Sequence, residues 1–239
     1  MIEIRQISDL AGFAECISLQ QTVWGDSPAE LVPQHIYVVA RKTGGQVLGA
    51  YDGERLVGYL LAFIGLENEI SYLHSHMTGV DADYRDQGVG RMLKLRQRDE
   101  ALVRGIRKIV WTFDPFKQRN AFFNLVKLGA YVRTFLPDVY GITTSHFDAG
   151  LPTDRLLAEW ILDSPRVEAA IGGSPRPVSG DLVELPVRPA GSAEDKYAFR
   201  DRFVQLLERG YVATGARRDA EQFSYVFQPF SEELQRDIS

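Results

Sequence analysis

Cysteine is almost absent from this sequence, and long apolar runs and clusters of basic residues are missing too. The single cysteine, Cys16, excludes a disulfide within the chain and any metal site built from several thiolates. Because Cys16 lies in an apolar helical pattern, we expect a buried, inert thiol. The longest apolar stretches, such as residues 56–66, are too short for a bilayer, which takes about 20 residues. We therefore expect no membrane-spanning segment.

Positive charge is also in short supply. The 27 lysine and arginine residues are outnumbered by 32 acidic residues, which gives a formal net charge of −5. A nucleic-acid-binding surface needs clustered basic residues to displace phosphate counterions, and the chain has no such run, so we expect no nucleic-acid partner. Residues 1–5 lack the charged-then-apolar plan of a signal peptide. Together these features lead us to expect a cytoplasmic protein.

What the chain does contain is a globular composition and a regular succession of elements. Of its 239 residues, 45% are hydrophobic and 25% are charged. A short strand is predicted at residues 1–6. Apolar residues then recur at helical spacing over residues 10–24, after Ser8 as a plausible N-cap. A capping box at residues 27–30 predicts a second helix, which ends at residues 44–45.

Most elements predicted in the next part of the chain are strands. Asp52-Gly53 is a strong hairpin signal between strands predicted at residues 46–51 and 55–64. Further along, the pattern predicts strands at residues 70–80, 108–113, 131–135 and 155–162, with helices at residues 88–104 and 115–129. The order predicts an α/β (α+β) fold with a mixed, largely antiparallel sheet and helices on both faces.

The tail is predicted to be an addition to this first domain, residues 1–162. Residues 163–181 are rich in proline, glycine and serine, which predicts a linker or surface loop. Residues 182–239 then predict a β-α-β-β extension. Its segment 206–212 repeats the helix–glycine–strand order of residues 125–132. A half-domain repeat packed on the first domain is one interpretation, and a chance recurrence of a common transition is the other.

The most informative segment covers residues 77–93. It reads as a strand, an acidic and aromatic turn, and then Arg85-x-x-Gly88-x-Gly90 at the start of a helix. The amides of a first helical turn and the helix dipole favour an anion. Glycines at 88 and 90 let a pyrophosphate approach without meeting a Cβ, and Arg91 can add a charge-assisted bond. A tight turn without a ligand is the alternative. A dinucleotide site is disfavoured because its glycine motif follows the first strand.

This segment resembles the acyl-CoA motif of the GNAT N-acetyltransferases, and the resemblance covers roughly residues 1–162. Other segments are similar to a branch of that family with a C-terminal extension: 74–77, 111–115, 119–121, 128–129, 140–141 and 153–155. The resemblance implies acetyl-CoA or another acyl-CoA as co-substrate, and no metal. The implied cofactor-binding residues are Met77, Thr78, Gly79, Val80, Arg85, Asp86, Gln87, Gly88, Val89, Gly90, Arg91, Asn120 and Asn124.

Catalysis would need a base, and the strand at residues 70–80 carries two histidines. Simple alternation puts His74, His76, Thr78 and Val80 on one face. In the GNAT family the general base can lie on this strand at the position of His74, and a mostly neutral imidazole suits that role. A hydrogen-bonded sheet histidine is the alternative for His74, and a structural role is favoured for His76. A zinc site of this histidine pair with Asp81 or Asp83 is a further, weaker hypothesis.

The resemblance places the remaining roles after residue 110. Asp114 is predicted to hold the amine or orient a base, or alternatively to cap the next helix. The family's usual tyrosine, which protonates the departing thiolate, is replaced here by Leu125, and Tyr140 is the substitute we predict. Arg133 and Arg155 are candidate ligands for a substrate carboxylate, with surface ion pairs as the alternative.

The sequence therefore predicts an acyl-CoA-dependent N-acyltransferase acting on a primary amine of a small molecule. Amino acids are the acceptors that the resemblance suggests, with acetyl, succinyl or another short acyl group. A non-catalytic acyl-CoA or metabolite sensor is the second hypothesis, which the missing tyrosine favours. A scaffold whose tail forms a homodimer is the third.

Overall fold

The computed structural model describes residues 1–25, 30–141, 151–175, 181–188, 192–219 and 222–238. The chain forms two compact units, Met1–Ile109 and Val110–Ser239. The boundary between them lies inside strand β5 (Lys108–Phe113). The capping box predicted at residues 27–30 lies mostly outside the described residues.

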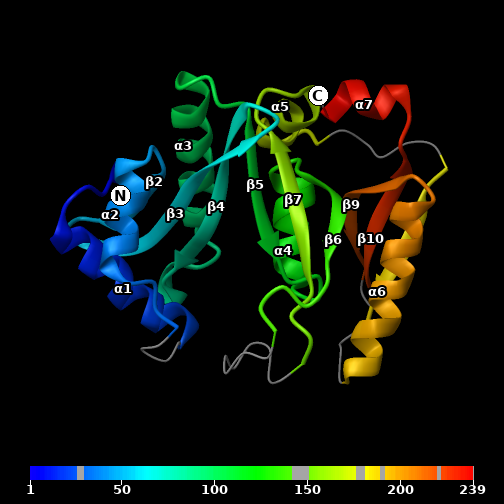
Figure 1. Ribbon diagram of the computed structural model, residues 1–239, viewed down its shortest axis with the longest axis horizontal. Coiled ribbons are helices and arrows are strands. Elements are labelled where there is room, and N and C mark those ends of the chain that lie inside the picture. Colours follow the sequence, from blue (N-terminus) through cyan, green and yellow to red (C-terminus); the bar gives the residue numbers. More distant parts are fainter. Residues whose placement is uncertain (26–29, 142–150, 176–180, 189–191, 220–221, 239) are drawn as a thin grey trace. The chain divides into compact units, whose positions relative to one another are not determined.

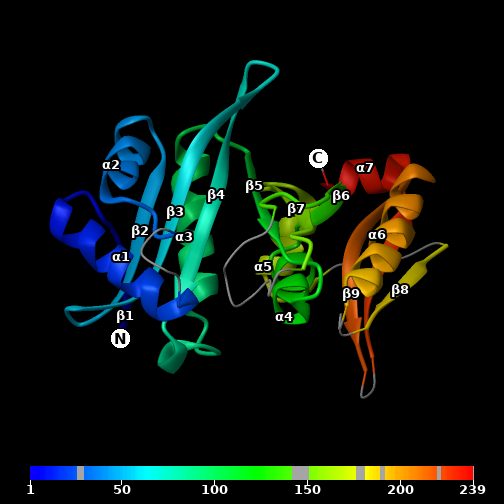
Figure 2. The ribbon, with the colours of Figure 1, turned by 60° about the horizontal axis from the view of Figure 1, so that its bottom comes forward.

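Unit 1 is an antiparallel sheet in the order β1-β2-β3-β4, seen at the blue-to-cyan end of the chain in Figure 1. Its long β3–β4 hairpin is clearest in Figure 2. The elements are β1 (Ile2–Gln6), α1 (Leu10–Trp24), α2 (Gln34–Lys42), β2 (Gln46–Asp52), β3 (Arg55–Glu67), β4 (Ile70–Val80), the 3₁₀ turn η1 (Ala82–Tyr84) and α3 (Val89–Val103).

Helices cover both faces of this sheet, as the apolar patterns predict. Phe13 of α1 and Tyr37 of α2 meet Tyr59 and Leu61 of β3 in one buried cluster. Cys16 is fully buried in the same cluster, and burial raises the pKa of its thiol far above the ordinary value. This confirms the prediction of an inert cysteine. On the opposite face, α3 lies against β3 and β4.

The helix boundaries differ from the predicted ones by a residue or more. Asp9, instead of Ser8, is the N-cap of α1, because its carboxylate accepts the Gly12 N–H at 2.8 Å. Helix α2 begins at Gln34, directly after Pro33, which has no N–H to leave unpaired. The predicted hairpin turn after β2 is confirmed, since Asp52 pairs with Arg55 and Gly53 has a φ of 61°.

Unit 2 contains a sheet in the order β5-β7-β6-β9-β10-β8. The pairs β6–β7, β6–β9, β9–β10 and β10–β8 are antiparallel. The elements after β5 are α4 (Gln118–Phe122), the π-helix η2 (Phe123–Lys127), β6 (Tyr131–Leu136), β7 (Arg155–Ile161), α5 (Pro165–Ile171), β8 (Val183–Val187), α6 (Ala193–Glu208), β9 (Tyr211–Arg218), β10 (Phe223–Pro229) and α7 (Glu232–Ile238).

The predicted β-α-β-β tail is present as β8, α6, β9 and β10, and it shares a sheet with β6 through the pair Val132–Ala213. The two similar segments each end a helix at a glycine with positive φ, Gly129 at 74° and Gly210 at 79°. Their strands, β6 and β9, are the ones that pair. This arrangement agrees with the repeat interpretation, which stays a prediction.

Two stretches expected to be irregular are helical. Residues 165–171, predicted to lie in a linker, form α5, whose N-cap Ser164 accepts the Val167 N–H. The expectation of a loop is wrong here, because proline at the first helical position, Pro165, favours a helix start. The chain also ends in α7, which the sequence pattern did not predict.

Phe203 of α6 is the centre of the aromatic core of unit 2. Its ring is fully buried, with centroids 5.5 Å from Phe135, 5.6 Å from Tyr225 and 4.9 Å from Phe227. Phe135 belongs to β6 and the other partners to β10, so one side chain joins the tail to the strand before it.

Phe203→Ala should therefore destabilise the protein by about 3–5 kcal/mol, because it leaves a cavity in this cluster. Urea unfolding followed by tryptophan fluorescence measures the change. Phe230→Ala is the matched control, since Phe230 is 48% exposed, and its cost should be much smaller. Equal effects of the two substitutions would show that the aromatic cluster does not hold the tail.

Candidate active site

An extra residue in β4 sets the geometry of the site in unit 1. Opposite β3, Met77 pairs with Leu61 and Ser75 pairs with Ala62, so His76 has no residue across from it. This is a β-bulge, and a bulge reverses which face the following residues occupy. His74 therefore shares its face with Met77, and Thr78 lies on the opposite face. The prediction that His74, Thr78 and Val80 share one face is wrong, because strict alternation does not hold across a bulge.

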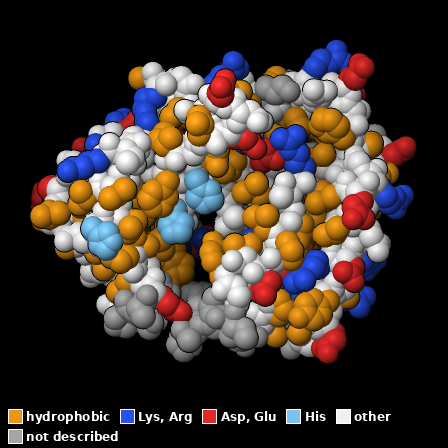
Figure 3. Space-filling model, viewed as in Figure 1, with side chains coloured by type: hydrophobic (Ala, Val, Ile, Leu, Met, Phe, Trp, Pro, Cys, Tyr) orange, Lys and Arg blue, Asp and Glu red, His pale blue; other side chains and the backbone are white. Residues whose placement is uncertain are grey.

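The two histidines lie side by side on the face that α1 and α2 cover. The ring centroids of His74 and His76 are 6.3 Å apart, and the His76 ring lies 5.6 Å from that of Phe63. His74 is half-buried and His76 is exposed. Desolvation, and then the positive charges of His76 and Lys94, lower the pKa of His74 from its ordinary value. Histidine side chains show in pale blue on the face drawn in Figure 3. The lowered pKa favours the neutral form of the His74 imidazole.

The turn between β4 and α3 presents exposed backbone. Gly88 is the N-cap of α3, has a φ of 82°, and a Cβ built on it would meet nothing within 4 Å. A Cβ on Gly90 would touch only Val80, at 3.9 Å. Arg85 is exposed, and its Nε donates to the Val80 carbonyl at 3.4 Å. The first-turn N–H groups of a helix have no partner within the helix. This cradle therefore fits an anionic group that needs close backbone approach, such as a diphosphate.

In unit 2, Asp114 and Tyr140 lie around the end of β5. An Asp114 carboxylate oxygen accepts the Phe116 N–H at 2.8 Å, which closes the turn after β5. Asp114 does not cap the next helix, because α4 begins at Gln118 and its N-cap is Lys117. Tyr140 is 51% exposed, and its hydroxyl lies 3.4 Å from that of Thr112 on β5. The Arg155 guanidinium carbon is 5.2 Å above the Tyr140 ring. The Tyr140 phenol therefore lies near β5, the strand that ends directly before Asp114.

A model of the acetyltransferase (GNAT) family matches residues 10–129, half of the 239-residue chain. The chain belongs to this family. As a GNAT acetyltransferase it uses an acyl-CoA as co-substrate, which the cradle at Gly88 and Gly90 fits. A search of curated proteins found no match.

Solved GNAT structures show the same fold. The ribosomal-protein-S18-alanine N-acetyltransferase from Escherichia coli is 16% identical, with 68% of this chain and 94% of that chain covered and a TM-score of 0.54. An N-acetyltransferase from Staphylococcus aureus Mu50 is 14% identical, with coverages of 68% and 99% and a TM-score of 0.54. A GNAT family acetyltransferase from Elizabethkingia anophelis with acetyl-CoA bound is 14% identical, with coverages of 67% and 97% and a TM-score of 0.53. These likenesses confirm the predicted fold class.

The helical segment before Gly129 departs from the usual GNAT pattern at one position. Leu125, where the family usually has a tyrosine, is buried in the core at 1% exposure. The surrounding turn is a π-helix, a form that is often found at functional sites. Asn120 is exposed, whereas Asn124 is buried and its Nδ2 has no hydrogen-bond partner among the described residues. The two asparagines therefore do not offer equivalent contacts to a ligand.

The two candidate arginines also differ. Arg133 makes a bidentate pair with Glu159, at 2.7 and 3.1 Å, so the ion-pair alternative describes its environment. Arg155 donates to the Asp154 carbonyl at 2.9 Å while its guanidinium lies over Tyr140. The two guanidinium groups therefore lie in different surroundings, a carboxylate for Arg133 and an aromatic ring for Arg155.

Neither a metal site nor a membrane span appears in the described part of the chain. No group of three or more histidine, cysteine, aspartate or glutamate residues gathers there to hold a metal ion, so the zinc hypothesis gains no support. None of the helices in the described ranges is long and apolar enough to cross a membrane.

A buried lysine beneath β4 was not predicted. Lys94 of α3 is 3% exposed, and its Nζ donates to Ser75 Oγ at 2.8 Å and to Gln97 Oε1 at 3.2 Å. Burial lowers its pKa to about 7. Helix α3 buries Val89, Leu93, Lys94, Gln97, Arg98 and Ala101. The sequence carried one signal of this buried polar face, since Lys94, Gln97 and Arg98 recur at the three- and four-residue intervals of one side of a helix.

Lys94 should make stability depend on pH. A lysine in the unfolded chain has a pKa of about 10.4, so between pH of about 7 and 10 the unfolded state binds the extra proton. The free energy of unfolding should rise across this range by up to about 1.4 kcal/mol per pH unit, with the full penalty present below pH of about 7. In Lys94→Met, the free energy of unfolding, measured by urea titration at several pH values, should no longer rise in this way. Lys42→Met, at an exposed position, should keep it; a slope that persists without Lys94 would contradict the account.

Proposed function

We propose that this GNAT acetyltransferase moves an acetyl or other short acyl group from acyl-CoA to a primary amine of a small cytoplasmic molecule. The observation that carries the proposal is the open cradle at the start of α3, together with the bulged strand that precedes it. Glycine backbone at Gly88 and Gly90 suits the diphosphate of CoA, and the family supplies the reaction class.

The donor half of the reaction is assigned mainly to residues of unit 1. The diphosphate binds the amides at the start of α3, and Arg85 and Arg91 add positive charge. The pantetheine arm follows β4, where the backbone of residues 77–80 bonds it and the thioester carbonyl. A bulge aims backbone groups away from the strand ladder, which suits stabilisation of an oxyanion. Asn120, on α4, is the stronger of the two asparagine candidates for the pantetheine amides because it is exposed.

Proton transfer is assigned to His74 and Tyr140. The acceptor amine attacks the thioester carbon, so that a C–N bond forms and the C–S bond breaks. His74 takes the amine proton, directly or through a water, and its lowered pKa keeps it in the accepting form. Tyr140 gives a proton to the CoA thiolate in place of the residue lost at Leu125. Asp114 orients the amine, while its bond to Phe116 fixes the turn after β5.

The acceptor is proposed to carry a carboxylate as well as an amine. Arg155 supplies a guanidinium beside an aromatic ring, which suits bidentate binding of a carboxylate. An amino acid or an amino acid analogue has both groups. A succinyl donor would add a second carboxylate to the same reaction.

A non-catalytic acyl-CoA-binding protein is the second candidate. The observation that favours it is Leu125, since the buried leucine removes the usual acid of the family. Release of free thiol from acetyl-CoA in the presence of an amine distinguishes the two functions, because a sensor binds the thioester without cleaving it.

Gly90→Ala separates ligand binding from folding. Gly90 does not have positive φ and its Cβ would meet little, so alanine should leave the stability unchanged or raise it by up to about 1 kcal/mol. The same methyl group would occupy the space of the diphosphate, so acetyl-CoA affinity should fall about tenfold or more. Calorimetric titration measures the affinity, and Val103→Ala at the exposed end of α3 is the control. Unchanged affinity in Gly90→Ala would move the diphosphate elsewhere.

His74→Gln tests the base. For the wild type, kcat/KM should rise with pH and level off above an apparent pKa below the ordinary histidine value of about 6.5. The substitution should lower kcat by about 100-fold or more and abolish this rise of kcat/KM with pH. His35→Gln, at an exposed position of α2, should change neither. If kcat/KM of His74→Gln still rises with pH in the same way, the base is another group.

A further inference from the structure

The two ends of the β6–β7 connection are tied together in unit 2, in what we call the Asp138 turn (residues 138–141 and 152–154). The Val139 and Tyr140 N–H groups donate to the Thr153 carbonyl at 3.1 Å and to its hydroxyl at 2.9 Å. The Thr153 N–H donates to the Asp138 carboxylate at 3.1 Å. Thr153 is fully buried. The backbone position of Tyr140 is therefore fixed by residues that follow it in the chain by more than ten positions.

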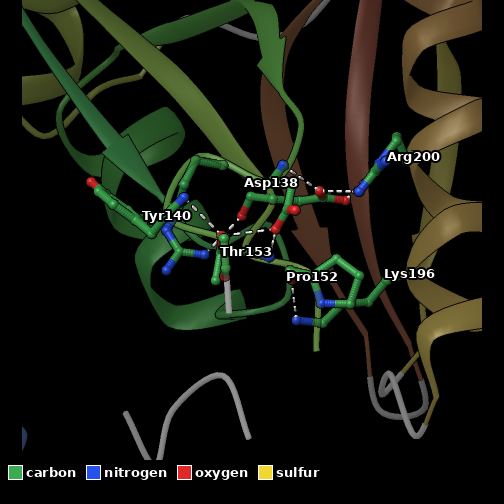
Figure 4. Close-up of polar contacts among 9 residues, drawn as sticks. Asp138, Tyr140, Pro152, Thr153, Lys196 and Arg200 are labelled. Atoms are coloured by element: carbon green, nitrogen blue, oxygen red, sulfur yellow. Dashed lines mark hydrogen bonds and ion pairs between the residues drawn. The ribbon is translucent and has the colours of Figure 1, made fainter. Parts of the chain in front are cut away.

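Helix α6 of the C-terminal tail binds this turn through two cations. Arg200 makes a bidentate pair with the Asp154 carboxylate, at 3.0 Å from its Nε and with a second, shorter bond from its Nη2. Lys196, one helical turn earlier, donates to the Pro152 carbonyl at 2.9 Å. The Asp138 N–H donates to the same Asp154 carboxylate at 3.1 Å. Figure 4 shows both cations reaching from α6 to the turn, with Tyr140 on its far side.

The burial of Asp154 makes this contact specific. Its side chain is 1% exposed, whereas that of Arg200 is 23% exposed. A buried carboxylate needs a charged partner and further hydrogen bonds to offset the loss of water. Both oxygens of Asp154 are used, by Arg200 and by the Asp138 amide. A planar guanidinium fixes direction as well as distance, so the turn has little freedom relative to α6.

Helix α6 is itself firmly placed. A capping box between Ser192 and Asp195 begins it. On the same side as the two cations, Phe199 and Phe203 are buried, and Phe203 contacts Phe135 near the end of β6. The helix is thus anchored in the aromatic core of unit 2, and its cations extend that anchorage to the Asp138 turn.

The turn places two side chains to which the proposed function assigns roles, Tyr140 as the proton donor to the CoA thiolate and Arg155 as the ligand of the acceptor carboxylate. Tyr140 lies within it, and Arg155 follows Asp154 directly. The Arg155 guanidinium lies over the Tyr140 ring, and the Tyr140 hydroxyl is near Thr112. Because Tyr140 is 51% exposed, little other packing holds its ring. Its placement depends on the backbone bonds of the turn.

We propose that Arg200 of the C-terminal tail is a positioning residue for the transfer reaction, which acts through Asp154 and the Asp138 turn to place Tyr140 and Arg155. The proposal rests on the proposed function. It gives the tail a role in thiolate protonation and acceptor binding, distinct from binding of the acyl-CoA diphosphate by unit 1.

Hydrogen–deuterium exchange of the intact protein tests the structural half without any assay of activity. In Arg200→Met, the amides of residues 138–141 should exchange at least about tenfold faster than in the wild type, because their anchoring carboxylate loses its partner. Arg200→Lys keeps the positive charge but lacks the planar guanidinium that makes the bidentate pair. It should therefore give an intermediate increase in the exchange rate. Arg202→Met, an exposed arginine on the same helix, is the matched control and should not change exchange there. Unchanged exchange in a folded Arg200→Met or Arg200→Lys protein would overturn the proposal.

Steady-state kinetics tests the positioning half. Arg200→Met should lower kcat/KM for the amine by about tenfold to 100-fold, since small displacements of an orienting group cost that much. The affinity for acetyl-CoA should stay within about twofold of the wild type, which a general loss of folded structure would not allow. Faster exchange with unchanged amine kinetics would also overturn the proposal. An absence of transfer by the wild-type enzyme would instead contradict the proposed function, and exchange would then report only on the contact between α6 and the turn.

Discussion

One extra residue in β4 is the constraint on which the site in unit 1 depends. Without the bulge at His76, the residues before and after it would keep a single alternation, and His74 would face the same side as Thr78. With the bulge, the His74 side chain faces α1 and α2. On the opposite face, the Ser75 hydroxyl accepts a hydrogen bond from the buried Lys94. A bulge also twists the strand and removes one residue from its ladder. The strand can therefore offer a histidine and backbone amides to one reacting group.

In unit 2, the ion pair between the buried Asp154 carboxylate and Arg200 constrains the structure as the bulge does in unit 1. The family's usual acid is replaced by Leu125, which fills part of the core, and the remaining phenol candidate, Tyr140, lies exposed on a turn. A flexible turn would place such a group poorly, and the pair between Asp154 and Arg200 removes that freedom. The tail is thus a structural part of unit 2, since it extends the sheet through β9 and binds the turn through α6.

Much of the fold could be predicted because apolar periodicity, hairpin residues and glycine at helix ends are local signals. Strand β5 was predicted with the same bounds, and the glycine turn before α3 was predicted from Arg85-x-x-Gly88-x-Gly90 and its place between a strand and a helix. The bulge could not be predicted, because it depends on pairing between two strands. Lys94 was missed because its burial is decided by tertiary packing, against its usual preference for the surface. The link between Asp154 and Arg200 joins residues that are 46 positions apart, so no local pattern could show it.

The most direct test of the central claim is calorimetric comparison of acetyl-CoA with S-acetylpantetheine, which has the same thioester and arm but no diphosphate. If the start of α3 binds the diphosphate, acetyl-CoA should bind at one saturable site. S-acetylpantetheine should bind about 100-fold more weakly, because it loses several charge-assisted hydrogen bonds. Equal affinities, or no binding of acetyl-CoA by the folded protein, would contradict the account.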